Sequence, residues 1–111
     1  MEISCKRTGA TLIVTLQGEL DHHNAAYVRE ELDGRLFHAG TKNLVFDLSG
    51  LKFMDSSGLG ILIGRYKAVS AMGGHTRIAS PSKQADRLIR LAGIHKIISV
   101  WNSVDEAVSG I

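Results

Sequence analysis

Strand-like and helix-like apolar patterns alternate along the whole chain, and this alternation restricts the fold more than any other feature of the sequence. In residues 11–20 apolar side chains recur at every second position, which is the period of a half-buried strand. In residues 25–36 they recur at helical spacing. The same two patterns predict further strands over 43–48, 76–79 and 97–101, and further helices over 57–72, 81–92 and 104–111.

A short strand around Ile3 and Cys5 precedes this series, and a turn at residues 8–10 is placed to join it to the next strand as an antiparallel hairpin. The predicted order is therefore ββαβαβαβα. Strands that alternate with helices are joined by right-handed crossovers and form a largely parallel sheet. The sequence thus predicts an α/β fold with a mixed, mostly parallel sheet, and its 111 residues are the size of a single domain, 1–111.

Polar residues and glycines mark where the predicted helices begin and end. Asp21 is expected to cap the first helix through its carboxylate, and Gly40 to close that segment. Ser80 is expected to cap the third helix, with Pro81 as its first residue. Ser103 is expected to cap the last helix.

Charge and composition exclude several classes of partner. Lysine and arginine number 13 against 11 aspartates and glutamates, and the net charge of +2 is too weak to indicate a nucleic acid or a membrane surface. No apolar run approaches the ~20 residues that span a bilayer, and the first residues lack a secretory pattern. The single cysteine, Cys5, excludes an internal disulfide, and the adjacent His22 and His23 lack the spacing of a metal-binding pair. We therefore expect a cytoplasmic domain without a metal or other cofactor.

Two loops follow strands and lead into helices, so both are expected at the same edge of the sheet: residues 18–23 and 51–58. The second contains Asp55, Ser56 and Ser57 at a helix start, where unpaired N–H groups and the positive end of the helix dipole lie. One of these residues could simply be the helix cap. Alternatively, one serine is a phosphate acceptor, and its phosphate would meet backbone donors that already face it. Spacing alone does not choose between the two serines.

Three glycines, Gly58, Gly60 and Gly64, fall in the first half of the second helix, where each costs roughly 1 kcal/mol relative to alanine. Close packing against the sheet accounts for such residues, and we expect it for Gly64. For Gly58 and Gly60 the alternative is a backbone that stays accessible to a partner. The glycines lack the spacing of a dinucleotide-binding loop, and no Gly-Lys-Ser/Thr is present, so a nucleotide-binding domain is disfavoured.

Three short segments carry a resemblance to a known family. Residues 18–23 read Gly-Glu-Leu-Asp-His-His, residues 53–60 read Phe-Met-Asp-Ser-Ser-Gly-Leu-Gly, and residues 64–67 read Gly-Arg-Tyr-Lys. Together they resemble the STAS-domain family of bacterial anti-sigma factor antagonists, and the similarity runs through the whole chain. Asp-His-His and Gly-Arg-Tyr-Lys favour the sporulation branch, the anti-sigma F factor antagonists. The general-stress branch, which tends to have Ser-Thr at the serine pair, is the alternative.

The resemblance implies a regulatory protein that is a substrate and not an enzyme. In this family the unmodified antagonist binds an anti-sigma factor, a serine kinase with bound ATP or ADP, and releases the sigma factor. The kinase then phosphorylates the second serine of the pair, here Ser57, and a serine phosphatase restores the antagonist. Asp21 is the implied acidic contact to the kinase, and we expect a monomer when the protein is free. The predicted partner-binding residues are Asp21, Asp55, Ser56, Gly58 and Gly60.

Overall fold

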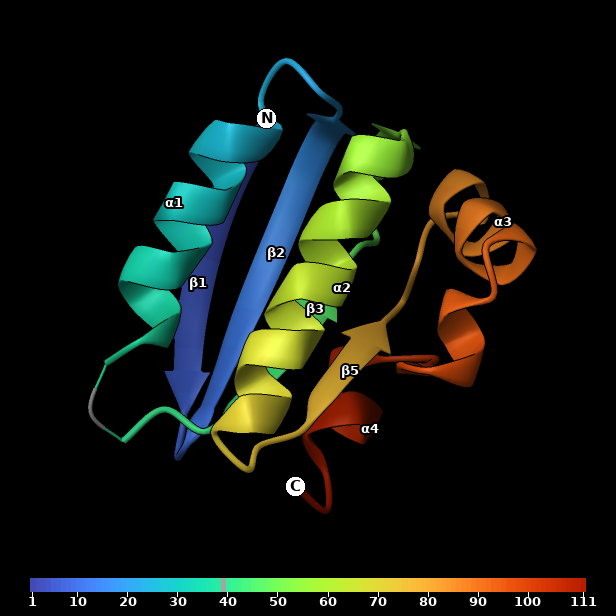
Figure 1. Cartoon of the computed structure of the whole chain (residues 1–111). Helices are drawn as coiled ribbons and strands as arrows, with labels where there is room; N and C mark the ends of the chain where they lie inside the picture. The colour runs from blue at the N-terminus through green and yellow to red at the C-terminus, as the bar shows by residue number, and fades with distance from the viewer. Residues whose placement is uncertain (39) are drawn as a thin grey trace.

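A mixed β-sheet forms the centre of the molecule in the computed structural model, which describes residues 1–38 and 40–111. The first two strands form the predicted hairpin, with Ile3 opposite Leu16, and the remaining strands join in parallel. The strands are β1 (Glu2–Thr8), β2 (Thr11–Leu20), β3 (Asn43–Asp47), β4 (Leu51–Met54), β5 (Thr76–Ala79) and β6 (Ser99–Trp101). The helices are α1 (Ala25–Leu36), α2 (Ser56–Ala71), α3 (Lys83–Leu91) and α4 (Val104–Val108), with a 3-10 turn at Ile94–Lys96 (Figure 1).

The sheet has the order β1-β2-β3-β5-β6, and β4 pairs with the far end of β2. This confirms the predicted α/β fold and the order of its elements. One element was not predicted: β4 lies in the stretch that was expected to be entirely loop. The strand β2 is long enough to pair with two neighbours: with β3 up to Thr15, and with β4 over Gly18–Leu20, where the register shifts between Gly18 and Glu19.

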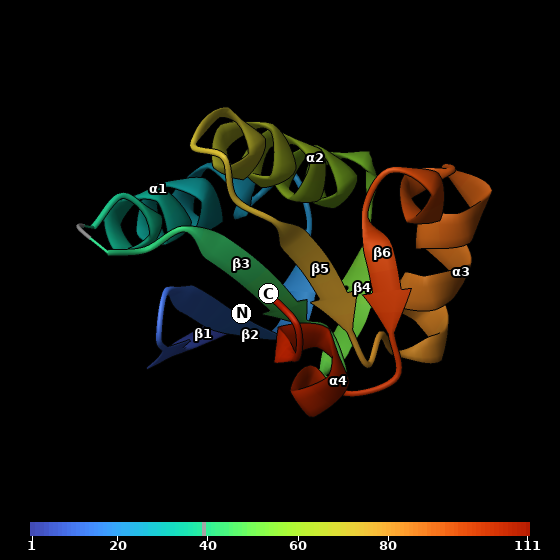
Figure 2. The same cartoon turned by 90° about the horizontal axis from the view of Figure 1, so that it is seen from below.

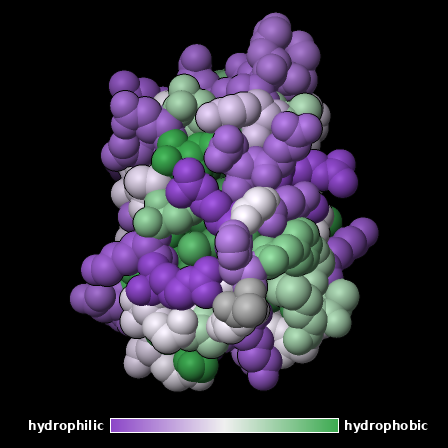
Figure 3. All heavy atoms as spheres, turned by 90° about the vertical axis from the view of Figure 1, so that its left-hand side faces the viewer, coloured by the Kyte–Doolittle hydropathy of each residue, from purple (hydrophilic) through white to green (hydrophobic). Residues whose placement is uncertain are grey.

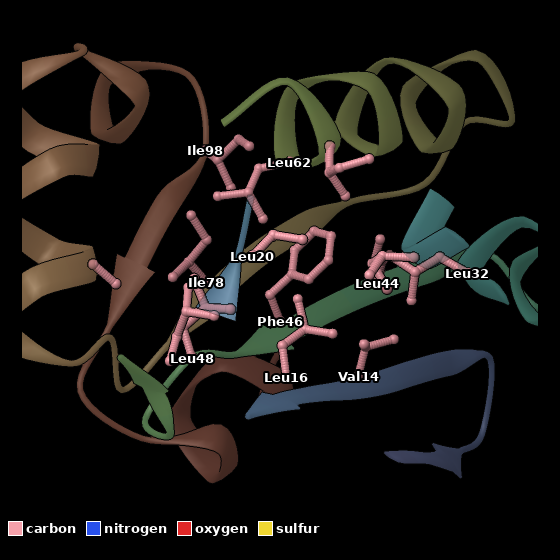
Figure 4. Packing of buried hydrophobic residues seen from close by; sticks show 14 of the residues in the cluster. Val14, Leu16, Leu20, Leu32, Leu44, Phe46, Leu48, Leu62, Ile78 and Ile98 are labelled. Carbon is pink, nitrogen blue, oxygen red and sulfur yellow. The ribbon is translucent and has the colours of Figure 1, made fainter. Parts of the chain in front are cut away.

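Helices lie on both faces of the sheet, and α3 lies beside it at one end, against β4 (Figure 2). The helices α1 and α2 cover one face, and the short helix α4 covers part of the other. The main core lies between the sheet and the layer of α1 and α2, where Leu16 and Phe46 of the sheet belong to one buried cluster with Leu62 of α2 (Figure 4). Burial of each such side chain contributes about 1.5–3 kcal/mol. A smaller buried cluster of Val45, Ala79 and Ala107 holds α4.

The outer surface beside α1 and β1 is mainly hydrophilic (Figure 3). Smaller patches of hydrophobic residues are visible between the polar side chains on this face. The edge strand β1 follows the same rule, because only Ile3 and Cys5 of its residues are partly buried. This pattern is typical of an edge strand whose inner face alone contacts the core.

The helix α1 covers the predicted apolar pattern of residues 25–36, but the two residues expected to bound it, Asp21 and Gly40, are wrong. The helix begins at Ala25 after Asn24, and it ends at Leu36, four positions before Gly40. Asp21 does accept a hydrogen bond from the backbone N–H of His23, at 2.9 Å, as its position suggested. That bond belongs to a separate turn that precedes the helix, so Asp21 shapes the loop and does not cap α1.

The predicted start of α3 is also wrong. Ser82 caps this helix by accepting a hydrogen bond from Ala85 N at 3.2 Å. Ser80 instead has a positive φ of 48° and donates its hydroxyl to the Asn102 carbonyl at 2.9 Å. The predicted cap of α4 is confirmed, because Ser103 accepts from Glu106 N at 3.1 Å.

Candidate functional site

The two loops singled out in the sequence meet at the N-terminus of α2. The backbone N–H of His22 donates to Asp55 Oδ2 at 3.1 Å, and Asp55 N donates to the carbonyl of Leu20 at 3.3 Å. The pairing of β4 with the end of β2 brings them together, because both strands finish at this edge of the sheet. The expectation that both loops open on one rim is confirmed.

Asp55 is the N-cap of α2. Its Oδ1 accepts hydrogen bonds from Ser57 N at 2.9 Å and Gly58 N at 3.2 Å, while Oδ2 accepts from His22 N. Desolvation opposes ionisation, but the hydrogen bonds from the Gly58, His22 and Ser57 amides outweigh it and lower the pKa of Asp55. The carboxylate is therefore ionised at neutral pH, and Asp55 fills the role of helix cap that the sequence left open.

The occupied cap narrows one expectation. A phosphate on either serine was expected to meet free backbone donors at the helix start. The N–H groups of Ser57 and Gly58 already donate to Asp55, so they are not free for a phosphate.

The two serines differ in their surroundings. Ser56 is exposed, whereas Ser57 is half-buried and lines an open groove of about 410 Å³ between α1 and α2. The hydroxyl of Ser57 is therefore at the surface of the domain and not in its hydrophobic core. The groove is lined by Ala25, Ala26, Arg29, Ser57, Gly60, Ile61, Gly64 and Arg65.

Two arginines and one aspartate give this groove its charge. Arg65 is buried, with its Nε 3.1 Å from Asp33 Oδ1, yet the two atoms are not aligned as a hydrogen bond, so the contact is an ion pair only. Arg29 Nε lies 3.8 Å from the other oxygen of Asp33. Arg29 and Asp33 were not singled out from the sequence, although their spacing is that of a helical ion pair, and Arg65 was named there only as part of the Gly-Arg-Tyr-Lys segment.

The glycines of α2 that pack closely are not those that were predicted to do so. A Cβ on Gly58 would collide with Met54 Cγ and lie 2.9 Å from the Leu20 carbonyl, so close packing is the reason for Gly58. Apart from its own stretch of helix, a Cβ on Gly60 or Gly64 would meet no atom of the described residues within 4 Å, and both glycines line the groove. The expectation of close packing at Gly64 is wrong, whereas Gly60 has the accessible backbone that was considered for it.

The neighbouring Asp21 and histidines complete the rim. Asp21 is half-buried, and its Oδ1 lies 3.6 Å from His23 Nδ1, while His22 Nδ1 lies 3.6 Å from Asp55 Oδ2. Both histidines are exposed, and their rings are 3.9 Å apart. Within residues 1–38 and 40–111, no cluster of three histidine, cysteine or acidic side chains is suited to hold a metal ion. Across the same residues, no helix has the length and apolar character needed to cross a membrane.

The fold and this rim define a small α/β domain that presents a serine pair at the start of a helix. The family model described as the STAS domain matches residues 2–107, and the chain belongs to this family. Among its relatives, an anti-sigma F factor antagonist from Paenibacillus polymyxa is 34% identical over 98% of this chain and 93% of its own. An anti-sigma-B factor antagonist from Bacillus subtilis is 30% identical over 90% of each chain. The protein is thus placed among the anti-sigma factor antagonists.

Solved structures support the same grouping. The anti-sigma factor antagonist SpoIIAA in its unphosphorylated form is 27% identical and superposes with a TM-score of 0.82, over 96% of this chain and 93% of its own. The Bacillus cell fate determinant SpoIIAA in its phosphorylated form is also 27% identical, with a TM-score of 0.75 over 96% of each chain.

Proposed function

We propose that this anti-sigma factor antagonist is a sporulation-type switch that phosphorylation of Ser57 turns off. The observation that carries the proposal is the position of Ser57, half-buried beside an open groove at the N-terminus of α2. That SpoIIAA has been solved in both unphosphorylated and phosphorylated forms supports a phosphorylation switch in this chain. The partner is an anti-sigma factor serine kinase with bound ATP or ADP, and a serine phosphatase reverses the modification in the cytoplasm.

The unmodified rim is proposed to bind the kinase. Asp21, Asp55 and Ser56 belong to the rim that presents Ser57, Gly60 lines the groove, and Gly58 contributes indirectly by letting α2 pack against β4. Phe53 precedes this rim and is 48% exposed, and exposed aromatic side chains are frequent anchors in protein interfaces. A partner that needs Ser57 as its substrate would therefore contact charged groups and an apolar anchor together.

Phosphorylation is proposed to release the kinase by charge and bulk. A phosphoserine adds about −1.5 to −2 charge at pH 7, next to the ionised Asp55. A hundredfold loss of affinity needs only about 2.7 kcal/mol, which one misplaced dianion in an interface can supply. The fold itself does not have to change, because Ser57 lies outside the hydrophobic core.

The sporulation branch is preferred to the general-stress branch on two grounds. The anti-sigma F relative is somewhat more similar, at 34% against 30% identity for the anti-sigma-B relative. The chain also has two serines at 56 and 57, together with the Gly-Arg-Tyr-Lys segment at 64–67. The general-stress antagonist remains the second candidate function.

The direct test is phosphorylation with a purified anti-sigma F kinase and ATP, followed by mapping of the modified residue by mass spectrometry. Ser57→Ala should bind the kinase and resist modification, whereas Ser56→Ala, its matched neighbour, should still be modified. Phosphate on Ser56, or none on either serine, would contradict the proposal. Preferential capture of an anti-sigma-B factor would favour the general-stress branch, and saturable nucleotide hydrolysis by the isolated chain would favour an enzyme.

A further inference from the structure

A phosphate on Ser57 would be stabilised by a positively charged neighbour. The backbone amides of Ser57 and Gly58 already donate to Asp55, and that carboxylate is ionised. On the side of Ser57 that faces Asp55, the oxygen atoms of the phosphate would therefore be repelled by the negative charge of that carboxylate. The favourable direction is the other side of Ser57, along the groove, where the arginines lie.

The two helices that form the groove run in the same direction (Figure 1). The ion pair between Arg65 of α2 and Asp33 of α1, at 3.1 Å, shows which residues of the two helices lie at the same height along their axes. At about 1.5 Å per residue, Ser57 lies about 12 Å before Arg65 along α2, and Ala25 lies the same distance before Asp33 along α1. Arg29 is half-way between, so its Cα lies about 6 Å along the axis from the level of Ser57.

Of the two arginines, Arg29 is the one that can move. Its side chain is 64% exposed, and its distance of 3.8 Å from Asp33 is that of a weak ion pair. The side chain of Arg65 is only 9% exposed and stays close to Asp33. Helical side chains also lean toward the N-terminus of their helix, which for Arg29 is the direction of Ser57.

The charge of the groove favours an anion. Two guanidinium groups share the carboxylate of Asp33, so the three side chains together carry a net positive charge. The Nε of Arg65 is buried without a hydrogen bond, although it lies beside that carboxylate. Asp33 therefore loses little when Arg29 leaves it, because Arg65 keeps it paired.

We propose that Arg29 binds the phosphoryl group of Ser57, exchanging its contact with Asp33 for a charge-assisted contact with the phosphate. The inference rests on the proposed function, which supplies the phosphorylation of Ser57, and it adds Arg29 as the residue that binds the phosphate. Gly60 and Gly64 leave the space that the two groups need, since a Cβ at either position would meet no atom of the described residues within 4 Å apart from its own stretch of helix. Once formed, the pair fills the groove, so modification removes the docking surface as well as adding charge.

The test uses the full chain with phosphoserine incorporated at position 57 during translation, so that it does not depend on any kinase. The second pKa of the phosphate is measured by ³¹P NMR titration in the wild type, in Arg29→Gln and in Arg35→Gln. Arg35 is the matched control, because it lies on the same helix, is 45% exposed and pairs with Glu31 at 3.7 Å outside the groove. A neighbouring cation lowers a phosphate pKa, so Arg29→Gln should raise it by about half a unit or more, and Arg35→Gln should not.

A second measurement observes Arg29 directly. Its Nε–H resonance should shift on phosphorylation, while that of Arg35 should stay in place. Equal ³¹P titrations in both variants, or an unchanged Arg29 resonance, would overturn the inference. Failure of the kinase to modify the chain would instead count against the proposed function and would leave the result for the incorporated phosphate intact.

Discussion

The backbone N–H of His22 donates a hydrogen bond to Asp55 Oδ2 at 3.1 Å, although the two residues are 33 positions apart in sequence. Through its other oxygen, the same carboxylate caps α2 by accepting from Ser57 and Gly58. One side chain therefore joins the loop after β2 to the helix that presents the serine pair. The shape of the rim depends on this carboxylate more than on the serines themselves.

Replacing Asp55 by alanine should destabilise the protein by about 1–2 kcal/mol, because the cap of α2 and the link to His22 are lost together. Asp86→Ala is the control, since Asp86 makes an exposed ion pair with Arg90 within α3 and should cost less than about 1 kcal/mol. Urea denaturation followed by circular dichroism measures both values. Equal small losses in the two variants would show that the rim does not depend on Asp55.

Stability should also fall in acid through the same residue. The pKa of Asp55 is lower in the folded protein than its ordinary value of 3.8, so the folded state binds its proton less readily than the unfolded chain. The stabilising contribution is therefore complete above about pH 4 and is lost as the pH falls through the folded pKa. The difference in unfolding free energy between wild type and Asp55→Asn should shrink below that pH. A difference that stays constant down to pH 2.5 would contradict this.

The spacing of apolar residues was sufficient to predict the elements in which that spacing is regular. The strand β4 has no such regular spacing. Its buried residues are Leu51 and Met54, at its two ends, while Lys52 and Phe53 between them are exposed. The strand exists because the far end of β2 is free to pair with it. A partner so distant in sequence leaves no local signal, so this segment was predicted as loop.

The start of α3 and the charged groove were missed for related reasons. Two serines flank Pro81, and the local sequence does not indicate that Ser80 is held by Asn102, which leaves Ser82 to cap the helix. The rim was predicted correctly because the ends of parallel strands meet at one edge. By contrast, the ion pair of Asp33 with Arg65 requires the packing of α1 on α2, which no spacing in the sequence specifies.

The attachment of α4 should depend on Arg77. This side chain donates to the carbonyls of Ala107 and Ser109 at 3.1 and 2.9 Å, and its guanidinium lies 4.6 Å from the centre of the Trp101 ring. Arg77→Leu should lose about 2–3 kcal/mol, because hydrogen bonds from a charged group are worth roughly 1.5–3 kcal/mol. Emission of Trp101, which is the single tryptophan, should shift to longer wavelength as α4 loosens.

Arg90→Leu is the control for this change, because the exposed Arg90 makes its ion pair with Asp86 on its own helix, away from α4. It should alter the unfolding free energy by less than about 1 kcal/mol and leave the emission of Trp101 unchanged. If both variants behave alike, the contacts of Arg77 do not hold α4.

Alanine substitutions in α2 should separate the packing glycine from the groove glycines. Gly58→Ala should destabilise the domain by about 1–3 kcal/mol, since its Cβ meets Met54 and the Leu20 carbonyl, and this overpacking exceeds the gain in helix propensity. Gly60→Ala and Gly64→Ala have free space, so each should stabilise the fold by up to about 1 kcal/mol. Their methyl groups narrow the groove beside Ser57, so both variants should nevertheless capture less of the anti-sigma kinase than the wild type. Stability and binding would then change in opposite directions in the same protein, which a general loss of folding cannot produce. Thermal denaturation and a pull-down with the kinase measure the two effects, and unimpaired capture by Gly60→Ala would mean that the partner does not use the groove.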